Sequence, residues 1–328
     1  MAYWPYRAYR AYKAYLPAEK QPSQNCIKLI PNLAETVCGF SSERTAFVEL
    51  SRFAFSTHAY TKQTLQHALT QIAAAGFKAV EILADKPHAW LDTFTATDHA
   101  RLIKQLDKLK LSVSSIDARC TSGFWSDPSP EPVFEPSLIS RSRELREWRI
   151  AYCRKALRLG KAVDARNVTF ASGRMLNGVP PELARTLLLD GLKRLIDYAD
   201  KLGQRFSLAC DAALFIEKTD ELAALVKTLH SKIFGAALNV GHAAACGEDP
   251  SAAVRKLAGH LFHVELADIR AKKRYPRVPG EGELNFRAIF AALNKAGYDG
   301  ALTWNLYAHD EDPDAACKKT IKYLKRMK

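Results

Sequence analysis

Strand-like and helix-like segments alternate eight times between residues 53 and 328 of this 328-residue chain. Each short apolar run is followed by an amphipathic stretch, and turns rich in glycine, proline or polar residues separate the two. Strict alternation of this kind favours a (β/α)8 TIM barrel, an α/β fold, over an open doubly wound sheet. The strands are expected at 53–56, 78–83, 111–117, 167–172, 205–209, 233–239, 261–266 and 301–306.

Helix signals fit the same scheme. Gly76 ends the first helix, Thr97 or Asp98 caps the second, and Pro180 with Pro181 opens a later one. No glycine-rich dinucleotide fingerprint and no phosphate-binding Gly-Lys loop follows any strand, so no nucleotide cofactor is expected. The helices are predicted at 61–75, 97–108, 143–163, 181–201, 219–231, 249–258, 286–296 and 313–328.

Residues 1–52 lack this alternation and are expected to form a flexible N-terminal extension to a barrel of residues 53–328. Tyrosines recur at every third position from Tyr3 to Tyr15, with arginine and lysine between them. A period of three matches neither a helix nor a strand. Interleaved aromatic and basic residues can stack on single-stranded nucleic acid, but a low-complexity extension is the favoured interpretation.

Composition narrows the function classes. Nine of the thirteen excess positive charges lie in residues 1–20 and 318–328, which favours solvated ends over a nucleic-acid surface. No segment approaches the roughly 18 apolar residues of a membrane span, and no secretory signal is evident. The seven cysteines are scattered without CxxC spacing. We therefore expect a cytoplasmic protein with reduced thiols and no membrane partner, and a homo-oligomer stays open.

Polar residues gather where the predicted strands end, which is where α/β barrels carry their chemistry. Glu81 ends the second strand, and a carboxylate there must find a partner, either a substrate or a structural hydrogen bond. Arg119 and Arg174 follow the third and fourth strands, where each could bind an anionic group or form an ion pair with Glu81 or Asp117. The further candidates are His88, Trp125 in a proline-rich loop, Asp211, Asn239, His242, Glu265, Asp268 and Asn305.

The segment 260–307 reads HLFHVELADIR, then VPGEGELNF, then AALNKAGYDGALTWNLY. Its order and wording resemble the xylose-isomerase-like TIM barrels, a superfamily of sugar isomerases, sugar and inosose epimerases and apurinic endonucleases. The resemblance covers roughly residues 53–328. It implies the barrel fold already indicated by the alternation, and a small-molecule sugar or polyol as the partner.

The resemblance also implies one divalent metal, held by a Glu, an Asp, a His and a Glu at the ends of strands five to eight. This chain carries Ala209, Asn239, Glu265 and Asn305 at those four positions. Hard divalent ions need negative ligands, so we expect no metal and no other cofactor. A metal site rebuilt from Asp211, His242 and Glu265 is the alternative.

Two functions follow from these residues. The first is an isomerase or epimerase that moves a proton next to a sugar carbonyl without metal. Its predicted catalytic residues are Glu265, the first candidate for the general base, with Glu81 and His242. Its predicted substrate-binding residues are His88, Arg119, Trp125, Arg174, Asp211, Asn239, Asp268 and Asn305. The second is a catalytically inactive carbohydrate-binding or partner subunit of the same fold.

Overall fold

A computed structural model describes residues 48–126, 133–273 and 275–327. The chain divides into two units, Met1–Ser42 and Glu43–Lys328, and every described residue belongs to the second. The tyrosine-rich repeat therefore lies outside the described residues, as do Pro128, Pro130 and Pro132. The domain boundary that we place after residue 52 stays a prediction.

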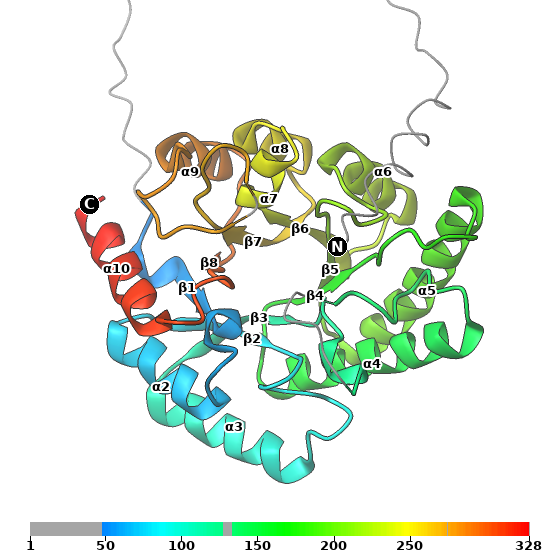
Figure 1. The fold of residues 1–328 in the computed structure, drawn as a ribbon, viewed down its shortest axis with the longest axis horizontal. Coiled ribbons are helices and arrows are strands. Elements are labelled where there is room, and N and C mark those ends of the chain that lie inside the picture. The colour runs from blue at the N-terminus through cyan, green and yellow to red at the C-terminus, as the bar shows by residue number, and fades with distance from the viewer. Residues whose placement is uncertain (1–47, 127–132, 274, 328) are drawn as a thin grey trace, which may run out of the picture. The chain divides into compact units, whose positions relative to one another are not determined.

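Eight parallel strands close into a barrel in the order β1 to β8, with β8 paired to β1 (Figure 1). This confirms the predicted TIM barrel. Strands β1 and β7 have the predicted bounds, and the other six differ from them by one or two residues at an end. The strands are β1 (Phe53–Ser56), β2 (Ala79–Leu83), β3 (Ser112–Asp117), β4 (Val168–Ala171), β5 (Phe206–Ala209), β6 (Phe234–Asn239), β7 (Leu261–Leu266) and β8 (Leu302–Trp304).

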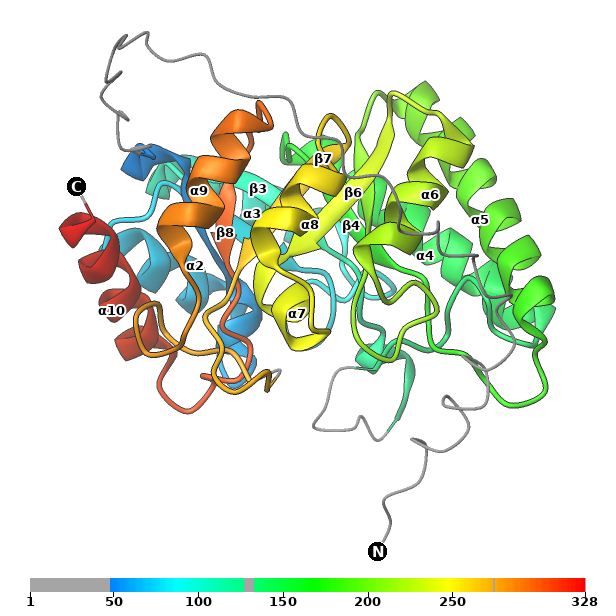
Figure 2. The ribbon, with the colours of Figure 1, turned by 90° about the horizontal axis from the view of Figure 1, so that it is seen from above.

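Helices surround the barrel, as both views show (Figure 1, Figure 2). None of the described helices has the length and apolar character that crossing a bilayer requires. The α-helices are α2 (Leu65–Ala75), α3 (Ala96–Leu109), α4 (Arg143–Ala162), α5 (Pro181–Leu202), α6 (Thr219–Leu229), α7 (Val240–Ala245), α8 (Pro250–Lys256), α9 (Phe286–Lys295) and α10 (Pro313–Arg326). Short 3-10 helices are η2 (Leu50–Arg52), η3 (Thr57–Tyr60) and η4 (Ser122–Phe124).

Local capping chemistry corrects two predicted helix starts. Thr95, not Thr97 or Asp98, caps α3, because its side chain accepts from the Asp98 N–H while the Asp98 carboxylate accepts from the Thr95 N–H. The first predicted helix begins at Leu65, not at residue 61, because η3 occupies Thr57–Tyr60 and Thr64 supplies the cap. The helix α7 was not predicted, since its six residues are too few for a periodic signal.

Strand alternation separates an apolar outer layer from a polar interior. Phe170, Phe206 and Phe234 on neighbouring strands pack ring to ring, with centroids 5.5 and 5.1 Å apart. Each is fully buried, and burying such a side chain stabilises the fold by about 1.5–3 kcal/mol. The intervening residues point into the barrel, so most of its interior side chains are polar and their partners decide what the interior can do.

Candidate active site

The lower barrel interior is a closed network of neutral groups. The Asn167 amide donates to the hydroxyls of Ser115, Thr169 and Ser207, at 3.3, 3.0 and 2.8 Å. The hydroxyls of Ser115 and Thr169 also lie 3.0 Å apart. These side chains come from β3, β4 and β5 and the residue before β4, and all are buried. Apart from the Asn167 side-chain oxygen, which has no partner among the described residues, their polar groups satisfy one another, which makes this level a structural floor.

Above this floor lies an ion triad that we call the Arg119 layer: Asp117, Arg119 and Glu265. Arg119 is only 6% exposed. Its Nε and Nη2 donate to the two Asp117 oxygens at 2.8 and 2.7 Å, and its Nη1 and Nη2 donate to the two Glu265 oxygens at 2.8 and 2.6 Å. Burial lowers the pKa of Arg119, but the two carboxylates outweigh burial and hold that pKa well above its usual value. The guanidinium is therefore a permanent buried cation.

Glu265 has no remaining capacity to accept. Besides Arg119, its Oε1 accepts from the Asn305 amide at 2.7 Å and its Oε2 from the Asn239 amide at 3.2 Å. A carboxylate offers about four lone-pair sites, and all four are engaged. Burial alone would raise the pKa of Glu265, yet the Arg119 guanidinium holds it below its usual range. Glu265 is thus a weak base in a fixed position.

A second acid lies next to the triad. Glu81 Oε2 is 2.7 Å from His263 Nε2, and both side chains are buried. Burial raises the pKa of Glu81 to about 7, with the Glu265 charge adding to the rise and His263 opposing it. Its Oε1 has no hydrogen-bond partner among the described residues. Glu81, His263 and Glu265 can each bring one ligand atom within 4.8 Å of the others.

His242 lies at the rim of the mouth. The Asn239 side chain accepts from the His242 N–H at 3.0 Å and so caps α7, which fixes the backbone that carries the ring. His242 Nδ1 lies 3.2 Å from Asp211 Oδ2, after β5, and its ring is 6.1 Å from that of Tyr307, after β8. The ring thus lies between two separated strand ends. Neither ring nitrogen has a hydrogen-bond partner within the described part of the chain, so the approach to Asp211 is an ion-pair contact and not a hydrogen bond.

Four of the predicted substrate-binding residues make structural contacts away from the Arg119 layer. His88 is held at both ring nitrogens, by Thr57 Oγ1 and the Tyr60 carbonyl, each at 3.1 Å, and burial lowers its pKa to about 4. Asp268 accepts four backbone N–H groups, from Ile269, Gly280, Gly282 and Leu284. Trp125 donates to the Glu135 carbonyl and is 41% exposed, and Arg174 is exposed above the Phe134 ring. None of the four contacts the Arg119 layer.

The prediction also left out several residues that belong to the site. Asp117 appeared only as a possible partner of Arg119, and that ion pair is present. His263, Tyr307 and His58 were not selected. His58 belongs to the site because its Nδ1 lies 3.6 Å from Asp117 Oδ2. The alternation of β7 could have indicated His263, since residues two apart on a strand share a face and Glu265 was already selected. His58 and Tyr307 follow short or irregular strand ends and carried no such signal.

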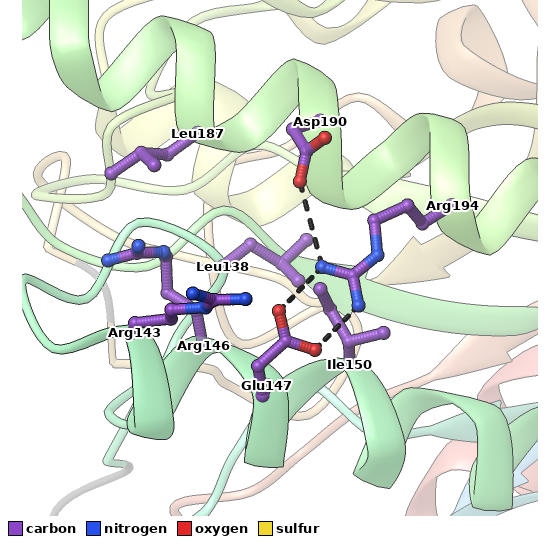
Figure 3. Close-up of a pocket in the computed structure, with 8 residues that line it drawn as sticks. All are labelled: Leu138, Arg143, Arg146, Glu147, Ile150, Leu187, Asp190 and Arg194. Atoms are coloured by element: carbon purple, nitrogen blue, oxygen red, sulfur yellow. Dashed lines mark hydrogen bonds and ion pairs between the residues drawn. The ribbon is translucent and has the colours of Figure 1, made fainter.

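A distinct hollow of about 220 Å³ lies elsewhere, between α4 and α5 (Figure 3). Three of its charged groups pair with one another: Arg194 donates twice to Glu147, at 2.7 and 2.5 Å, and lies 3.7 Å from Asp190. Arg146 donates to the carbonyls of Ser140 and Arg141. A paired surface cluster of this kind is better explained by helix–helix contact than by chemistry.

Residues 69–327 match the family described as "Xylose isomerase-like TIM barrel". The chain belongs to this family. Curated relatives include inosose dehydratases of Geobacillus thermodenitrificans, 29% identical over 147 residues, and Clostridium beijerinckii, 30% identical over 161 residues. These alignments cover 40% and 42% of this chain, and 48% and 53% of those proteins. The chain thus matches about half the length of these relatives.

Solved structures of the xylose isomerase-like fold agree over a longer span. A D-tagatose 3-epimerase-like protein superposes with a TM-score of 0.69 and 19% identity, covering 84% of this chain and 97% of its own. An IolI protein with a bound zinc atom superposes with a TM-score of 0.68 and 15% identity, covering 83% and 95%. At these identities the likeness establishes the fold.

The metal that the family resemblance implies can be tested against the groups present. Ala209 offers no ligand atom, and Asn239 and Asn305 direct their amide nitrogens at Glu265. Glu265 could release an oxygen only by giving up a hydrogen bond from Arg119 or from an amide. A neighbouring guanidinium would also repel a second cation. These groups do not fit a family-type divalent ion.

Proposed function

We propose that the protein catalyses proton transfer next to the carbonyl of a sugar or cyclic polyol, in the manner of an isomerase or epimerase, in the cytosol. The observation that carries this proposal is the His242–Asp211 pair at the barrel mouth. A histidine beside a carboxylate, with neither ring nitrogen engaged in a hydrogen bond within the described residues, is suited to act as a general base. The family membership and the inosose dehydratase relatives support the substrate class.

His242, and not Glu265 as predicted from the sequence, is the general base in this proposal. Glu265 accepts four hydrogen bonds, and Arg119 lowers its pKa, so taking a proton would break a charged pair. His242 makes no such bond through Nε2 within the described residues. Glu81, whose pKa is about 7, is the second candidate, but it lies deeper, against His263.

Each group then has a defined step. The carbon–hydrogen bond beside the carbonyl breaks, the proton passes to His242 Nε2, and the bonding electrons form an enolate. The unsatisfied Asn305 Oδ1 accepts from a substrate hydroxyl. Protonation of the enolate on its opposite face by a second acid, for which Glu81 is the candidate, gives an epimer. Return of the proton from His242 to the former carbonyl carbon, with transfer of the hydroxyl proton to the former carbonyl oxygen, gives an isomer. Loss of a neighbouring hydroxide from the same enolate would give dehydration.

The test is exchange of solvent deuterium into a bound ketose. The wild-type protein is incubated in D2O with inosose, D-fructose, D-tagatose, D-psicose and L-ribulose, and NMR records deuterium at the carbon beside the carbonyl. His242→Asn should slow exchange by about 10²–10⁴-fold while binding persists. His230→Asn is the matched control, because His230 is exposed and has a left-handed backbone that asparagine tolerates. Its exchange rate should equal that of the wild type.

Two results would contradict the proposal. If the wild-type protein binds these ketoses and exchanges none of them, the protein is a binding subunit. If His242→Asn exchanges at the wild-type rate, His242 is not the base, and Glu81→Gln becomes the next variant to measure.

A further inference from the structure

Arg119 is the residue in the barrel interior whose charge most needs an explanation. The cation is buried between two carboxylates from different parts of the chain, Asp117 on β3 and Glu265 on β7. A guanidinium has five N–H donors, and the four hydrogen bonds to these carboxylates use four of them. The fifth, on Nη1, has no partner among residues 48–126, 133–273 and 275–327.

We infer that the Arg119 guanidinium is a built-in cation, which takes the position between Asp117 and Glu265 that a divalent ion would otherwise fill and binds the carbonyl oxygen of the substrate through its remaining N–H. The second half of this inference rests on the proposed function. The first half, that the guanidinium takes the place of a divalent ion, does not depend on the proposed function.

The charges around Arg119 and the ligand atoms near it support this assignment. Asp117 and Glu265 give two negative charges within hydrogen-bond distance of one guanidinium, so the triad keeps a net negative charge. Removing Arg119 would leave these two carboxylates facing each other across a cavity, with Glu81 and His263 beside Glu265. Carboxylates with one imidazole suit Mn²⁺ or Zn²⁺. The arginine therefore excludes the metal from a set of ligands that could otherwise hold it.

A purely structural triad is the competing explanation. Buried ion pairs contribute little net stability, because desolvating the charges offsets their attraction. A structural triad would also need no unsatisfied donor. Among the described residues, Arg119 Nη1 donates one hydrogen bond, to Glu265, and so keeps one N–H as a donor. The Asn305 Oδ1 beside Glu265 has no partner there and is an acceptor. A carbonyl oxygen with a neighbouring hydroxyl would satisfy both.

The experiment measures metal on purified protein after equilibrium dialysis against Mn²⁺ or Zn²⁺. The wild-type chain should hold no stoichiometric ion, and Arg119→Ala should hold about one per chain. Arg149→Ala is the matched control. Arg149 is also a buried arginine, but its guanidinium donates to the carbonyls of Ala118 and Arg119 and makes no ion pair with a described residue. This variant should hold no ion.

Added ligands give a second measurement. The melting temperature of Arg119→Ala should rise with Mn²⁺ and with low concentrations of guanidinium, while those of the wild type and Arg149→Ala should not. If Arg119→Ala fails to fold, Arg119→Lys keeps a cation at the site and should fold without binding metal. One bound ion per wild-type chain that Glu265→Gln removes would overturn the inference. So would a folded Arg119→Ala that responds like Arg149→Ala, or an Arg119→Lys that binds an ion.

These readouts need no substrate, so they separate the cation assignment from the proposed reaction. A metal-free wild type with a metal-binding Arg119→Ala supports the built-in cation even if no ketose exchanges deuterium. The catalytic half is then tested by kinetics: Arg119→Lys should lower kcat more than it raises KM, because a lysine cannot hold both carboxylates and the enolate oxygen at once. Equal losses in binding and turnover would contradict that half.

Discussion

Asp268 and His242 follow neighbouring strands of the same barrel, and the sequence marks both as site residues. Their surroundings differ completely. Asp268 accepts four backbone N–H groups and ties the loop 280–284 to the end of β7. His242 is carried by a capped helix and leaves Nε2 without a hydrogen bond in the described structure. Residue type and strand-end position are therefore insufficient to assign a role, and the partners of each polar atom decide it.

The largest effect on stability is expected at Asp268. Asp268→Asn keeps one oxygen but places an amide NH₂ against N–H donors, such as those of Gly280 and Gly282. An added Cβ on Gly282 would lie 2.1 Å from Asp268, so the loop backbone packs directly against this carboxylate. We expect a loss of about 3–5 kcal/mol, measured by urea unfolding. Asp249→Asn is the control, since asparagine caps a helix as well as aspartate and should change stability little.

That comparison also shows how far the sequence could lead. Alternation of apolar runs sufficed for all eight strands, because each strand is buried on both faces and bounded by turn residues. The scaffold segment PGEGELNF was recognised, but not that its backbone binds Asp268. A sequence predicts where residues lie along a strand. The contacts of Asp268 depend instead on which backbone N–H groups the following loop places next to its carboxylate.

The Arg119 layer was beyond sequence reasoning for a related reason. Arg119 and Glu265 are 146 residues apart and meet only because β8 pairs with β1 and closes the barrel. Either residue alone was a reasonable candidate, and Glu265 was a reasonable base until its four donors were known. In the sequence, Asn239 and Asn305 stand where metal ligands are expected and indicate a lost site. In the structure, both side-chain amides donate hydrogen bonds to Glu265.

A second prediction concerns pH and the deep Glu81–His263 pair. The pKa of Glu81 is raised from 4.5 to about 7 in the folded chain. The folded state therefore holds a proton that the unfolded state loses between these values. Stability from this group is complete below pH 4.5 and declines as pH rises through 7, by about 3 kcal/mol at most. The difference in unfolding free energy between wild type and Glu81→Gln should follow this decline. A difference that stays constant from pH 4.5 to 8 would show that Glu81 is already ionised throughout.

The smallest effect on stability is expected at Asn239, where two substitutions separate its two hydrogen bonds. Its oxygen caps α7, and its nitrogen donates to Glu265. Asn239→Ser keeps a capping oxygen and loses the Glu265 contact, which should cost about 1 kcal/mol. Asn239→Ala loses both and should cost about 1 kcal/mol more. If the cap positions His242 for proton transfer, Asn239→Ala should slow deuterium exchange far more than Asn239→Ser does. Equal exchange rates in the two variants would mean that Asp211, and not the capped helix, sets the position of the His242 ring.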